Sequence, residues 1–234
     1  MAIGSIPTSA AEREGAVRRA AAQPVICWQC GAQDAPHLFC PNCNAIQPFP
    51  EQADYFQVLG VPRSLVIDTE ALQRRYYELH RRMHPDLYQT GPQAARVASL
   101  RNTATVNRAY DTLRDPIDRG LYWLALRGES LGTNNNRVPP ELAELVFETQ
   151  ETLEEFRSAR DGNGHAALAR AVESARAGLE QRRAALLAQL QQNFARWDAP
   201  GADDVALTRE LKAVLSALAY VGTLIRDVEK ELDR

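Results

Sequence analysis

The chain has 234 residues, of which 45% are hydrophobic and 24% are charged, and its formal net charge at pH 7 is −3. This length is enough for one or two buried cores, and so small a net charge provides no general attraction to nucleic acid or to an anionic membrane surface. No apolar stretch approaches the roughly 20 residues of a membrane-spanning helix. We therefore expect neither nucleic acid nor a membrane as a partner.

Residues 1–25 are rich in alanine and arginine, and we predict that they form a flexible N-terminal tail. The tail lacks the apolar segment of a secretory signal. Its arginines and alanines are typical of mitochondrial transit peptides, but Glu12 and Glu14 argue against that interpretation. We expect a bacterial cytoplasmic protein, with the mitochondrial matrix as the alternative location.

The four cysteines lie within residues 26–50 as two C-x2-C pairs. Each pair predicts a tight knuckle that offers two thiolates, and four thiolates suit one tetrahedral zinc ion. We expect a small zinc-knuckle or zinc-ribbon cap with Trp28 and Phe39 as its few core residues, because so short a segment cannot build a core without metal. The predicted metal ligands are Cys27, Cys30, Cys40 and Cys43.

Other roles for the cysteines are less favoured. An iron–sulfur cluster also fits four thiolates, whereas a disulfide needs an oxidising compartment, which nothing in the sequence indicates. A thioredoxin-like redox site needs a βαβ unit, and no such pattern surrounds either pair. Residues 32–39, between the pairs, contain no lysine or arginine to contact phosphate. Four cysteines that saturate a zinc ion leave no open position for chemistry, so we do not expect an enzyme.

Residues 51–130 are predicted to form a second domain that contains a helical hairpin. It opens with a short apolar segment, residues 54–61, which a glycine closes. A basic helix follows, which Asp68 caps and which ends near Met83, because Pro85 cannot continue it. The apolar face of this helix consists of Leu72, Tyr76, Leu79 and Met83. Its other side carries Arg74, Arg75, Arg81 and Arg82.

A second long helix is predicted after Pro92, and it ends before Pro116. Its apolar positions are Val97, Leu100, Val106, Ala109, Tyr110 and Leu113. The two helices place His84, Pro85 and Asp86 in an exposed loop at the tip of the hairpin. The alternative is a helical hairpin whose loop holds these residues by chance and whose arginines are only a solvated face.

Residues 131–138 are predicted to form a linker, and residues 139–234 a three-helix bundle. The last helix is the most regular, because its apolar residues alternate in steps of four and three. This heptad seam consists of Leu207, Leu211, Val214, Leu218, Val221, Ile225, Val228 and Leu232. The middle helix contributes Leu168, Val172, Leu179, Leu186, Leu190, Phe194 and Trp197. The expected fold class is therefore mainly α, with a small metal-binding cap.

The first helix of the bundle carries a candidate binding surface. Its core face consists of Leu142, Leu145, Val146, Thr149, Leu153 and Phe156. The opposite face carries Glu144, Glu148, Glu151 and Glu155. Phe147 lies beside these glutamates, well off the core face, and an exposed phenylalanine rimmed by carboxylates suits a partner with basic side chains. The alternative is an acidic, solvated face with one aromatic residue that packs on a neighbouring domain.

Several motifs accompany the His-Pro-Asp tripeptide. Asp54-Tyr55-Phe56 and Leu59-Gly60 resemble the opening signature of J-domains, and residues 107–113 resemble the core of their third helix. This part of the chain therefore resembles a J-domain. The resemblance implies that the loop and the basic helix engage a heat-shock-seventy-class chaperone and stimulate its ATP hydrolysis. The residues to which it gives this role are His84, Pro85, Asp86, Arg74, Arg75, Arg81 and Arg82.

The whole arrangement resembles the HscB-type iron–sulfur cluster co-chaperones, in particular those members with an N-terminal tetracysteine domain. The motifs that carry this resemblance lie at residues 27–31, 39–43, 47–48, 54–56 and 119–122. The resemblance implies a non-enzymatic co-chaperone whose J-domain docks an HscA-type or mitochondrial heat-shock-seventy-class ATPase. It also implies that the bundle binds the IscU-type scaffold protein on which iron–sulfur clusters are built.

The scaffold-binding positions that this resemblance implies are Phe147, Glu148, Glu151, Glu155 and Leu218. Ala143 and Glu144 stand where the family has bulky aliphatic residues, which weakens or shifts the patch. Leu218 also belongs to the heptad seam, so its two interpretations conflict. A second function remains open, namely a general J-domain co-chaperone that delivers unfolded clients. The sequence also leaves open a homodimer.

Overall fold

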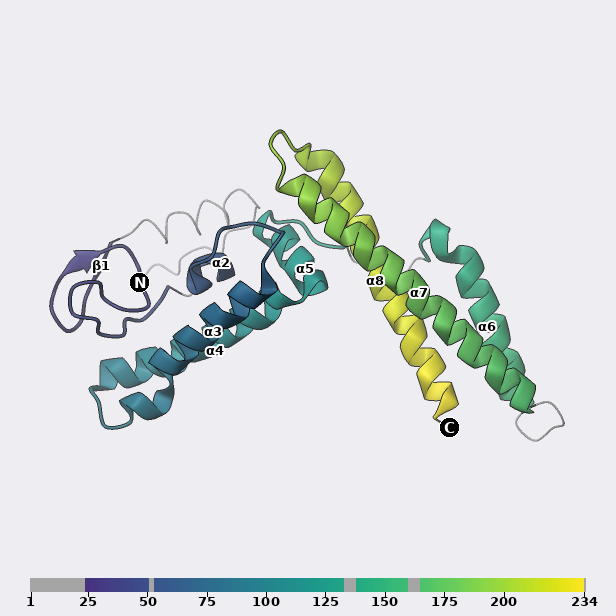
Figure 1. The fold of residues 1–234 in the computed structure, drawn as a ribbon, viewed down its shortest axis with the longest axis horizontal. Coiled ribbons are helices and arrows are strands. Elements are labelled where there is room, and N and C mark those ends of the chain that lie inside the picture. Colours follow the sequence, from purple (N-terminus) through teal and green to yellow (C-terminus); the bar gives the residue numbers. More distant parts are fainter. Residues whose placement is uncertain (1–23, 51–52, 133–137, 160–164, 234) are drawn as a thin grey trace, which may run out of the picture. The chain divides into compact units, whose positions relative to one another are not determined.

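The structure, a computed structural model, describes residues 24–50, 53–132, 138–159 and 165–233. It divides into two compact units, with the boundary between Glu129 and Ser130, and each is described by itself. Both consist mainly of helices (Figure 1), so the mainly α fold class is confirmed. Most of the predicted N-terminal tail and of the predicted linker lie outside the described residues.

The N-terminal cap contains a short antiparallel sheet and an isolated bridge. β1 (Val25–Ile26) pairs with β2 (Gln33–Asp34), and Phe39 bridges to Ile46. Each pairing encloses one of the two cysteine pairs, so main-chain hydrogen bonds close the base of both turns. The small cap predicted from the cysteine spacing is therefore confirmed.

The two cysteine turns have nearly the same geometry. The N–H groups of Cys27 and Cys40 each donate to the carbonyl oxygen five residues further on, at 2.8 Å in both turns. Gly31 follows the first pair with φ of 73°, and Asn44 follows the second with φ of 57°. Glycine and asparagine are the residues that adopt this left-handed conformation most readily, so the sequence suits the turn at both positions.

The cap shares one hydrophobic core with the helices that follow it. Leu38 and Ile46 are buried in this core, with exposed fractions of 9% and 1%. Trp28 and Phe39, which we predicted as the cap's core residues, are only half-buried and pack at the edge of the core. Leu38 and Phe39 are neighbours in the chain, and of the two it is the leucine whose side chain is buried in the core. The leucine therefore takes the inner position that we expected for the phenylalanine.

The first two helices begin and end at the residues that the sequence indicates. Asp54 caps α2 (Tyr55–Leu59) in a capping box, and Gly60 ends this helix with φ of 66°. Asp68 caps α3 (Thr69–Met83) by accepting two main-chain N–H groups of the first turn. The predicted cap and end of the basic helix are thus confirmed.

α4 (Gln93–Arg114) completes the hairpin with α3, and a short 3-10 helix, η1 (Pro85–Tyr88), lies at its tip. α5 (Pro116–Leu126) was not predicted as a separate helix. Asp115 caps it, and the residue after this aspartate is its first helical residue, a position that proline favours. The Asp-Pro pair that ends α4 therefore also starts α5.

The buried face of α4 differs from the one that we predicted near its start. Val97 and Leu100, which we assigned to the apolar face, have exposed fractions of 41% and 60%. The residues that face the core there are small or polar, namely Ala95, Ala98, Ser99 and Asn102. This part of α4 packs closely against the end of α3 and against the cap, where small side chains and hydrogen-bonding groups fit better than large aliphatic ones.

The second unit contains η2 (Pro140–Leu142), α6 (Ala143–Ser158), α7 (His165–Trp197) and α8 (Asp204–Leu232). The three long helices confirm the predicted bundle. The heptad seam of α8 is buried along its whole length except at Leu232, which is half-buried. None of the helices in the described parts of the chain is both long enough and apolar enough to cross a membrane.

Candidate functional site

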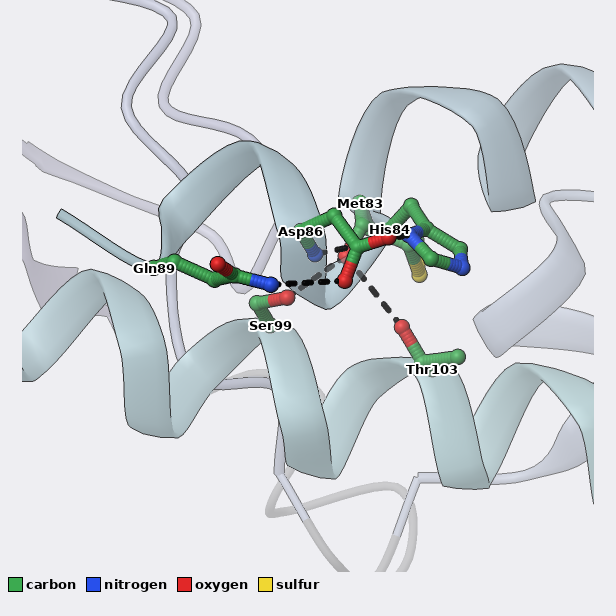
Figure 2. Close-up of polar contacts among 6 residues, drawn as sticks. All are labelled: Met83, His84, Asp86, Gln89, Ser99 and Thr103. Atoms are coloured by element: carbon green, nitrogen blue, oxygen red, sulfur yellow. Dashed lines mark hydrogen bonds and ion pairs between the residues drawn. The ribbon is translucent and has the colours of Figure 1, made fainter. Parts of the chain in front are cut away.

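The His-Pro-Asp loop begins at Met83, whose main-chain carbonyl oxygen is held by α4. Two hydroxyls donate to it, Ser99 Oγ at 2.6 Å and Thr103 Oγ1 at 3.2 Å (Figure 2). The last carbonyls of a helix have no partner within the helix, and the N–H of Leu87, four residues further on, donates instead to the carbonyl oxygen of His84 at 3.0 Å. The two hydroxyls replace that missing donor. The loop therefore starts from a fixed point on the hairpin.

The loop is also tied to η1. The phenol of Tyr88 donates to the main-chain carbonyl oxygen of Arg82 at 2.9 Å. The side-chain amide of Gln89 donates to the Asp86 carboxylate at 2.9 Å, and Figure 2 shows these two side chains directed at one another. These contacts limit the conformations that the loop can adopt.

His84 and Asp86 face solvent at the tip of the hairpin. Their side chains are 44% and 70% exposed, and the imidazole Nδ1 lies 3.4 Å from a carboxylate oxygen of Asp86. The same Nδ1 accepts the main-chain N–H of Asp86 at 3.4 Å, which leaves Nε2 directed away from the loop's own backbone. His84 has the extended conformation, φ −53° and ψ 131°, that the following proline favours. The loop thus presents an imidazole and a carboxylate to solvent.

The four arginines of α3 differ in their surroundings. Arg74 makes a solvent-exposed ion pair with Glu70 at 3.6 Å, and Arg81 is exposed. Arg75 donates to the carbonyl oxygen of Leu59 at 3.1 Å and to the carboxylate of Glu78 at 2.9 Å. Arg75 therefore also joins α3 to the end of α2, whereas Arg74 and Arg81 lie on the outer face.

Arg82 contacts the cap. Its guanidinium lies 4.0 Å from the centre of the Phe39 ring, and it donates to the side-chain oxygen of Asn44 at 2.9 Å. Arg75 and Arg82 both line a groove of about 550 Å³ between the cap and α3. Arg75 and Arg82, two of the four predicted chaperone-binding arginines, thus also contact other elements of the unit.

The four cysteine sulfurs form one cluster in which all ligand atoms lie within 4.8 Å of one another. Cys27 and Cys43 approach to 3.6 Å, and Cys30 and Cys40 to 3.8 Å. A tetrahedron with metal–sulfur bonds of about 2.3 Å has edges of roughly 3.8 Å, so this arrangement fits one four-coordinate metal ion. All four cysteines are free thiols.

Hydrogen-bond donors contact the sulfurs of Cys27 and Cys30 and favour the thiolate form of these two residues. Cys27 Sγ accepts the main-chain N–H of Gln29 at 3.4 Å and the side-chain amide of Gln47 at 3.3 Å. The side-chain amide of Asn42 lies 3.5 Å from Cys30 Sγ and lowers the pKa of this thiol to about 6. Four soft sulfur donors are a ligand set for a soft or borderline metal ion.

The predicted scaffold-binding residues do not all lie on a surface. Phe147 is 69% exposed on α6. The glutamates beside it are also exposed, namely Glu144, Glu148, Glu151 and Glu155. Leu218, by contrast, is buried in the bundle with an exposed fraction of 2%. The structure therefore favours the seam interpretation of Leu218, because a side chain in this position has no surface to offer a partner.

Two polar residues to which the sequence analysis assigned no role lie between the cap and α4. Gln47 is 4% exposed, and Asn102 is 2% exposed. The side-chain amide of Asn102 donates to the carbonyl oxygen of Gln47 at 2.8 Å. The sequence did contain a signal for Asn102. This residue lies four positions before Val106 and so on the core face of the predicted helix, where a polar side chain needs a buried hydrogen-bond partner.

A comparison with protein families matches the DnaJ domain model to residues 54–122. The match begins at the capping aspartate of α2 and ends within α5, and it includes the whole hairpin with the His-Pro-Asp loop.

Three curated relatives of this chain share the name HscB. The human iron–sulfur cluster co-chaperone protein HscB is 41% identical over 106 residues, 44% of this chain and 45% of that protein. The mouse HscB protein is 37% identical over 138 residues, 56% and 58% of the two chains. An HscB homologue from Arabidopsis thaliana is 31% identical over 129 residues, 55% and 51% of the two chains. The chain thus spans about half the length of the curated relatives that it matches.

Solved structures extend the likeness beyond the DnaJ domain. The crystal structure of human HscB matches with a TM-score of 0.65 and 25% identity, over 88% of this chain and 98% of that one. Chaperone HscB from Vibrio cholerae matches with a TM-score of 0.58 and 25% identity, over 77% and 98% of the two chains. The chain is therefore a DnaJ-domain protein related in sequence and fold to the HscB co-chaperones, with a four-cysteine group before its DnaJ domain.

Proposed function

We propose that this protein is a co-chaperone of iron–sulfur cluster assembly. Its His-Pro-Asp loop stimulates ATP hydrolysis by an HscA-type, heat-shock-seventy-class chaperone, and its C-terminal bundle binds an IscU-type scaffold. The observation that carries the proposal is the loop itself, which is anchored at Met83 by two hydroxyls and presents the exposed side chains of His84 and Asp86. The names of the human, mouse and Arabidopsis relatives support the link to iron–sulfur clusters.

The chaperone-binding surface consists of the loop and the outer face of α3. Arg74 and Arg81 lie on that face and attract an acidic surface of the ATPase at long range. Arg75 and Arg82 add charge, but their contacts with Leu59 and Asn44 also hold the domain together. We therefore expect Arg74 and Arg81 to act mainly on the rate of association.

The scaffold-binding surface is the exposed face of α6. Phe147 provides an apolar anchor, and Glu148, Glu151 and Glu155 provide carboxylates for basic side chains of the scaffold. We leave Leu218 out of this surface because it is buried. The patch is small and acidic, which favours one dedicated partner over many unfolded clients.

The cysteine group binds zinc in this proposal, with Cys27, Cys30, Cys40 and Cys43 as its ligands. Four thiolates saturate a structural zinc ion and leave no position for a substrate or water. The ion therefore stabilises the cap rather than performing catalysis, and the protein itself is not an enzyme. Metal analysis of the purified protein, with zinc counted against iron, tests this assignment directly.

The compartment and the oligomeric state follow as further proposals. We propose a bacterial cytoplasmic protein, with the mitochondrial matrix as the alternative. Relatives come from eukaryotes and from a bacterium, so they are compatible with both compartments. The homodimer stays a prediction, which sedimentation equilibrium at several concentrations tests.

The function is tested by steady-state ATPase measurements on the cognate chaperone. We expect stimulation by this protein, and a larger, synergistic stimulation when the IscU-type scaffold is added. His84→Gln removes both effects, while the substitution of an exposed residue of the bundle such as Val205→Ala leaves them unchanged. Full stimulation by the His84→Gln variant would exclude the J-domain mechanism. Stimulation that ignores the scaffold would instead favour the general folding co-chaperone.

A further inference from the structure

We propose that the four-cysteine cap positions the His-Pro-Asp loop, and that it does so through two contacts, one made by Asn102 and one by Arg82. The significance of this inference rests on the proposed stimulation of a chaperone by the loop. The physical coupling itself is measured without the chaperone, so the two proposals can fail separately.

The first part of the connection is the contact between the cysteine cluster and Gln47. The side-chain amide of Gln47 donates to Cys27 Sγ at 3.3 Å and to the carbonyl oxygen of Ala45 at 3.0 Å. Its side-chain oxygen accepts the main-chain N–H of Trp28 at 3.4 Å. Since Gln47 is almost fully buried and all its side-chain partners belong to the cap, its position depends on how the cysteine turns are held. Groups that donate to metal ligands are coupled to the metal in this way.

The second part is the contact between this segment and α4. Asn102 donates to the carbonyl oxygen of Gln47 at 2.8 Å and accepts the main-chain N–H of Phe49 at 3.2 Å. Its amide therefore uses both its donor and its acceptor on the chain that leaves the cap. With only 2% of Asn102 exposed, water cannot readily replace either bond, so a displaced cap leaves a buried amide unsatisfied.

The third part lies on the same two turns of α4. Ser99 and Thr103, the near neighbours of Asn102 along the helix, donate to the carbonyl oxygen of Met83 where the loop begins. Figure 2 shows both hydroxyls reaching this oxygen from one helix. One short stretch of α4 therefore holds the exit of the cap and the start of the loop, and a shift of α4 relative to α3 would disturb both.

A second contact reaches the loop from α3. The guanidinium of Arg82 packs on Phe39 at 4.0 Å and donates to Asn44 at 2.9 Å, and both partners belong to the cap. The main-chain carbonyl of Arg82 accepts the phenol of Tyr88, which holds η1. The cap therefore contacts the side chain of Arg82, the residue before Met83, while α4 donates hydrogen bonds to the main-chain carbonyl of Met83 itself.

Two separate contacts thus connect the cysteine cluster with the start of the loop. Because such coupling is reciprocal, it predicts an effect in each direction. Loss of the metal should loosen the loop, and loss of the Asn102 contact should loosen the metal. A cap that merely adds stability to the whole unit would weaken all of its elements alike.

The test is amide hydrogen exchange on the full chain, with zinc bound and after removal of zinc by a chelator. We expect removal to accelerate exchange about tenfold at Arg82, Met83 and Leu87, as for the loss of one or two hydrogen bonds. Exchange at Val106 and Leu113, in the part of α4 that lies beyond the contacts, should change less than about twofold. Unchanged exchange at the loop, or an equal acceleration at all five amides, overturns the proposal.

Asn102→Ala tests the reciprocal effect. With zinc bound, this variant should already show fast exchange at Arg82, Met83 and Leu87, and removal of zinc should then add little. It should also release zinc to a colorimetric chelator about five- to tenfold faster than the unaltered protein. Thr105→Ala is the matched control, because this hydroxyl donates to the carbonyl oxygen of Arg101 within α4. Zinc release by Asn102→Ala at the control rate contradicts the proposal.

Asn44→Gly tests the second contact without altering the core. Asn44 has positive φ, which glycine adopts without strain, so the substitution removes mainly the bond to Arg82. We expect faster exchange at Arg82 and Met83 but not at Val106 or Leu113. If Asn102→Ala exchanges fast throughout the unit, Asn44→Gly is the variant that tests whether the cap is coupled to the loop. Exchange unchanged at Arg82 removes this contact from the proposal. If exchange behaves as expected while the unaltered protein stimulates no chaperone, the coupling stands and the proposed function fails.

Discussion

Ser99 Oγ lies 2.6 Å from the main-chain carbonyl oxygen of Met83, and this hydrogen bond joins α4 to the last residue of α3. The bond is fully buried, and it lies one residue before His84. It explains how a loop whose own side chains are exposed can still have a defined direction, because the backbone from which the loop begins is fixed inside the domain.

Ser99→Ala should therefore weaken both the domain and its proposed activity. The variant leaves the Met83 carbonyl with the longer bond from Thr103 only, so we expect a loss of about 1–2 kcal/mol in the free energy of unfolding. Urea denaturation checks this value against Thr105→Ala, whose hydroxyl is bonded within its own helix. If the Ser99→Ala variant is as stable as the control, the hydrogen bond from Thr103 is sufficient for the Met83 carbonyl oxygen.

Removal of the metal should unfold the cap and loosen the end of the hairpin that the cap contacts, but it should leave the bundle unchanged. Leu38 and Ile46 of the cap are buried in the same core as α3 and α4, and a cap of this size cannot keep its structure without its metal. We expect chelation to shift the indole N–H resonance of Trp28, because this N–H donates to the carbonyl oxygen of Ile46. Resonances of the bundle should stay unchanged. Cys40→Ala should reproduce the effect without a chelator.

Tyr122→Phe should destabilise the contact between α5 and α2. The Tyr122 hydroxyl accepts the main-chain N–H of Tyr55 at 2.8 Å, and the two rings stack at 4.4 Å. Loss of the hydroxyl should cost about 1 kcal/mol at neutral pH, measured by urea denaturation. Tyr77→Phe is the control, because Tyr77 is 53% exposed; equal losses in the two variants would contradict a specific role for the Tyr122 bond.

Tyr122 also predicts a dependence on alkaline pH. Burial raises the pKa of its phenol well above the ordinary value of 10. The folded state thus holds this proton more tightly than the unfolded state does, so the stabilisation is complete below pH 10 and is lost as the pH rises above it. Stability of Tyr122→Phe should fall less steeply above pH 10 than that of the unaltered protein. Parallel pH profiles for the two proteins would contradict this assignment.

Arg157→Ala should destabilise the bundle more than the loss of an exposed ion pair. Arg157 on α6 donates to Glu231 on α8 at 3.1 Å, and the side chain of Glu231 is only 7% exposed. Removal of the cation leaves a largely buried carboxylate, for which we expect a loss of about 1–2 kcal/mol by thermal or urea unfolding. Arg183→Ala breaks a pair with Glu180 on the surface of α7 and should cost less than about 0.5 kcal/mol. The reverse order would contradict this interpretation.

Phe147→Ala should weaken binding of the scaffold without weakening the fold. The side chain is 69% exposed, so little burial is lost, while a hot-spot aromatic residue contributes at least about 1 kcal/mol to binding. Isothermal titration calorimetry with an IscU-type protein measures the difference. Val205→Ala, an equally exposed apolar residue on α8, serves as the control. Equal affinities of both variants and the unaltered protein would remove Phe147 from the proposed surface.

Much of the fold could be predicted from local patterns. Apolar residues at helical spacing, together with the cap at Asp68 and the stop at Pro85, are sufficient to place the basic helix of the hairpin. The heptad seam of α8 likewise predicts its buried face. α5 was missed because the Asp-Pro pair before it was taken only as a stop, although the same pair is also a helix start.

The local hydrophobic pattern predicted the wrong buried residues where segments distant in the sequence pack against each other. Val97 and Leu100 were assigned inward by their hydrophobicity, but α4 turns Ser99 and Asn102 inward instead, because the end of α3 and the exit of the cap need hydrogen-bond donors. Leu218 was given two roles by sequence, and its burial in the bundle decides between them.

The sequence by itself determined the chemistry of this protein: four thiolates at metal-binding spacing, a His-Pro-Asp tripeptide between two helices, and an acidic helix with one aromatic residue. These three features depend only on residue type and on spacing along the chain. Both can be read from the sequence through the period of its hydrophobic residues and the positions of its turn residues. Only the tertiary structure decided that the cysteine cap and the loop hold the same stretch of α4, because Gln47 and Asn102 are 55 residues apart. A hydrogen bond between distant segments leaves no periodic trace in either of them.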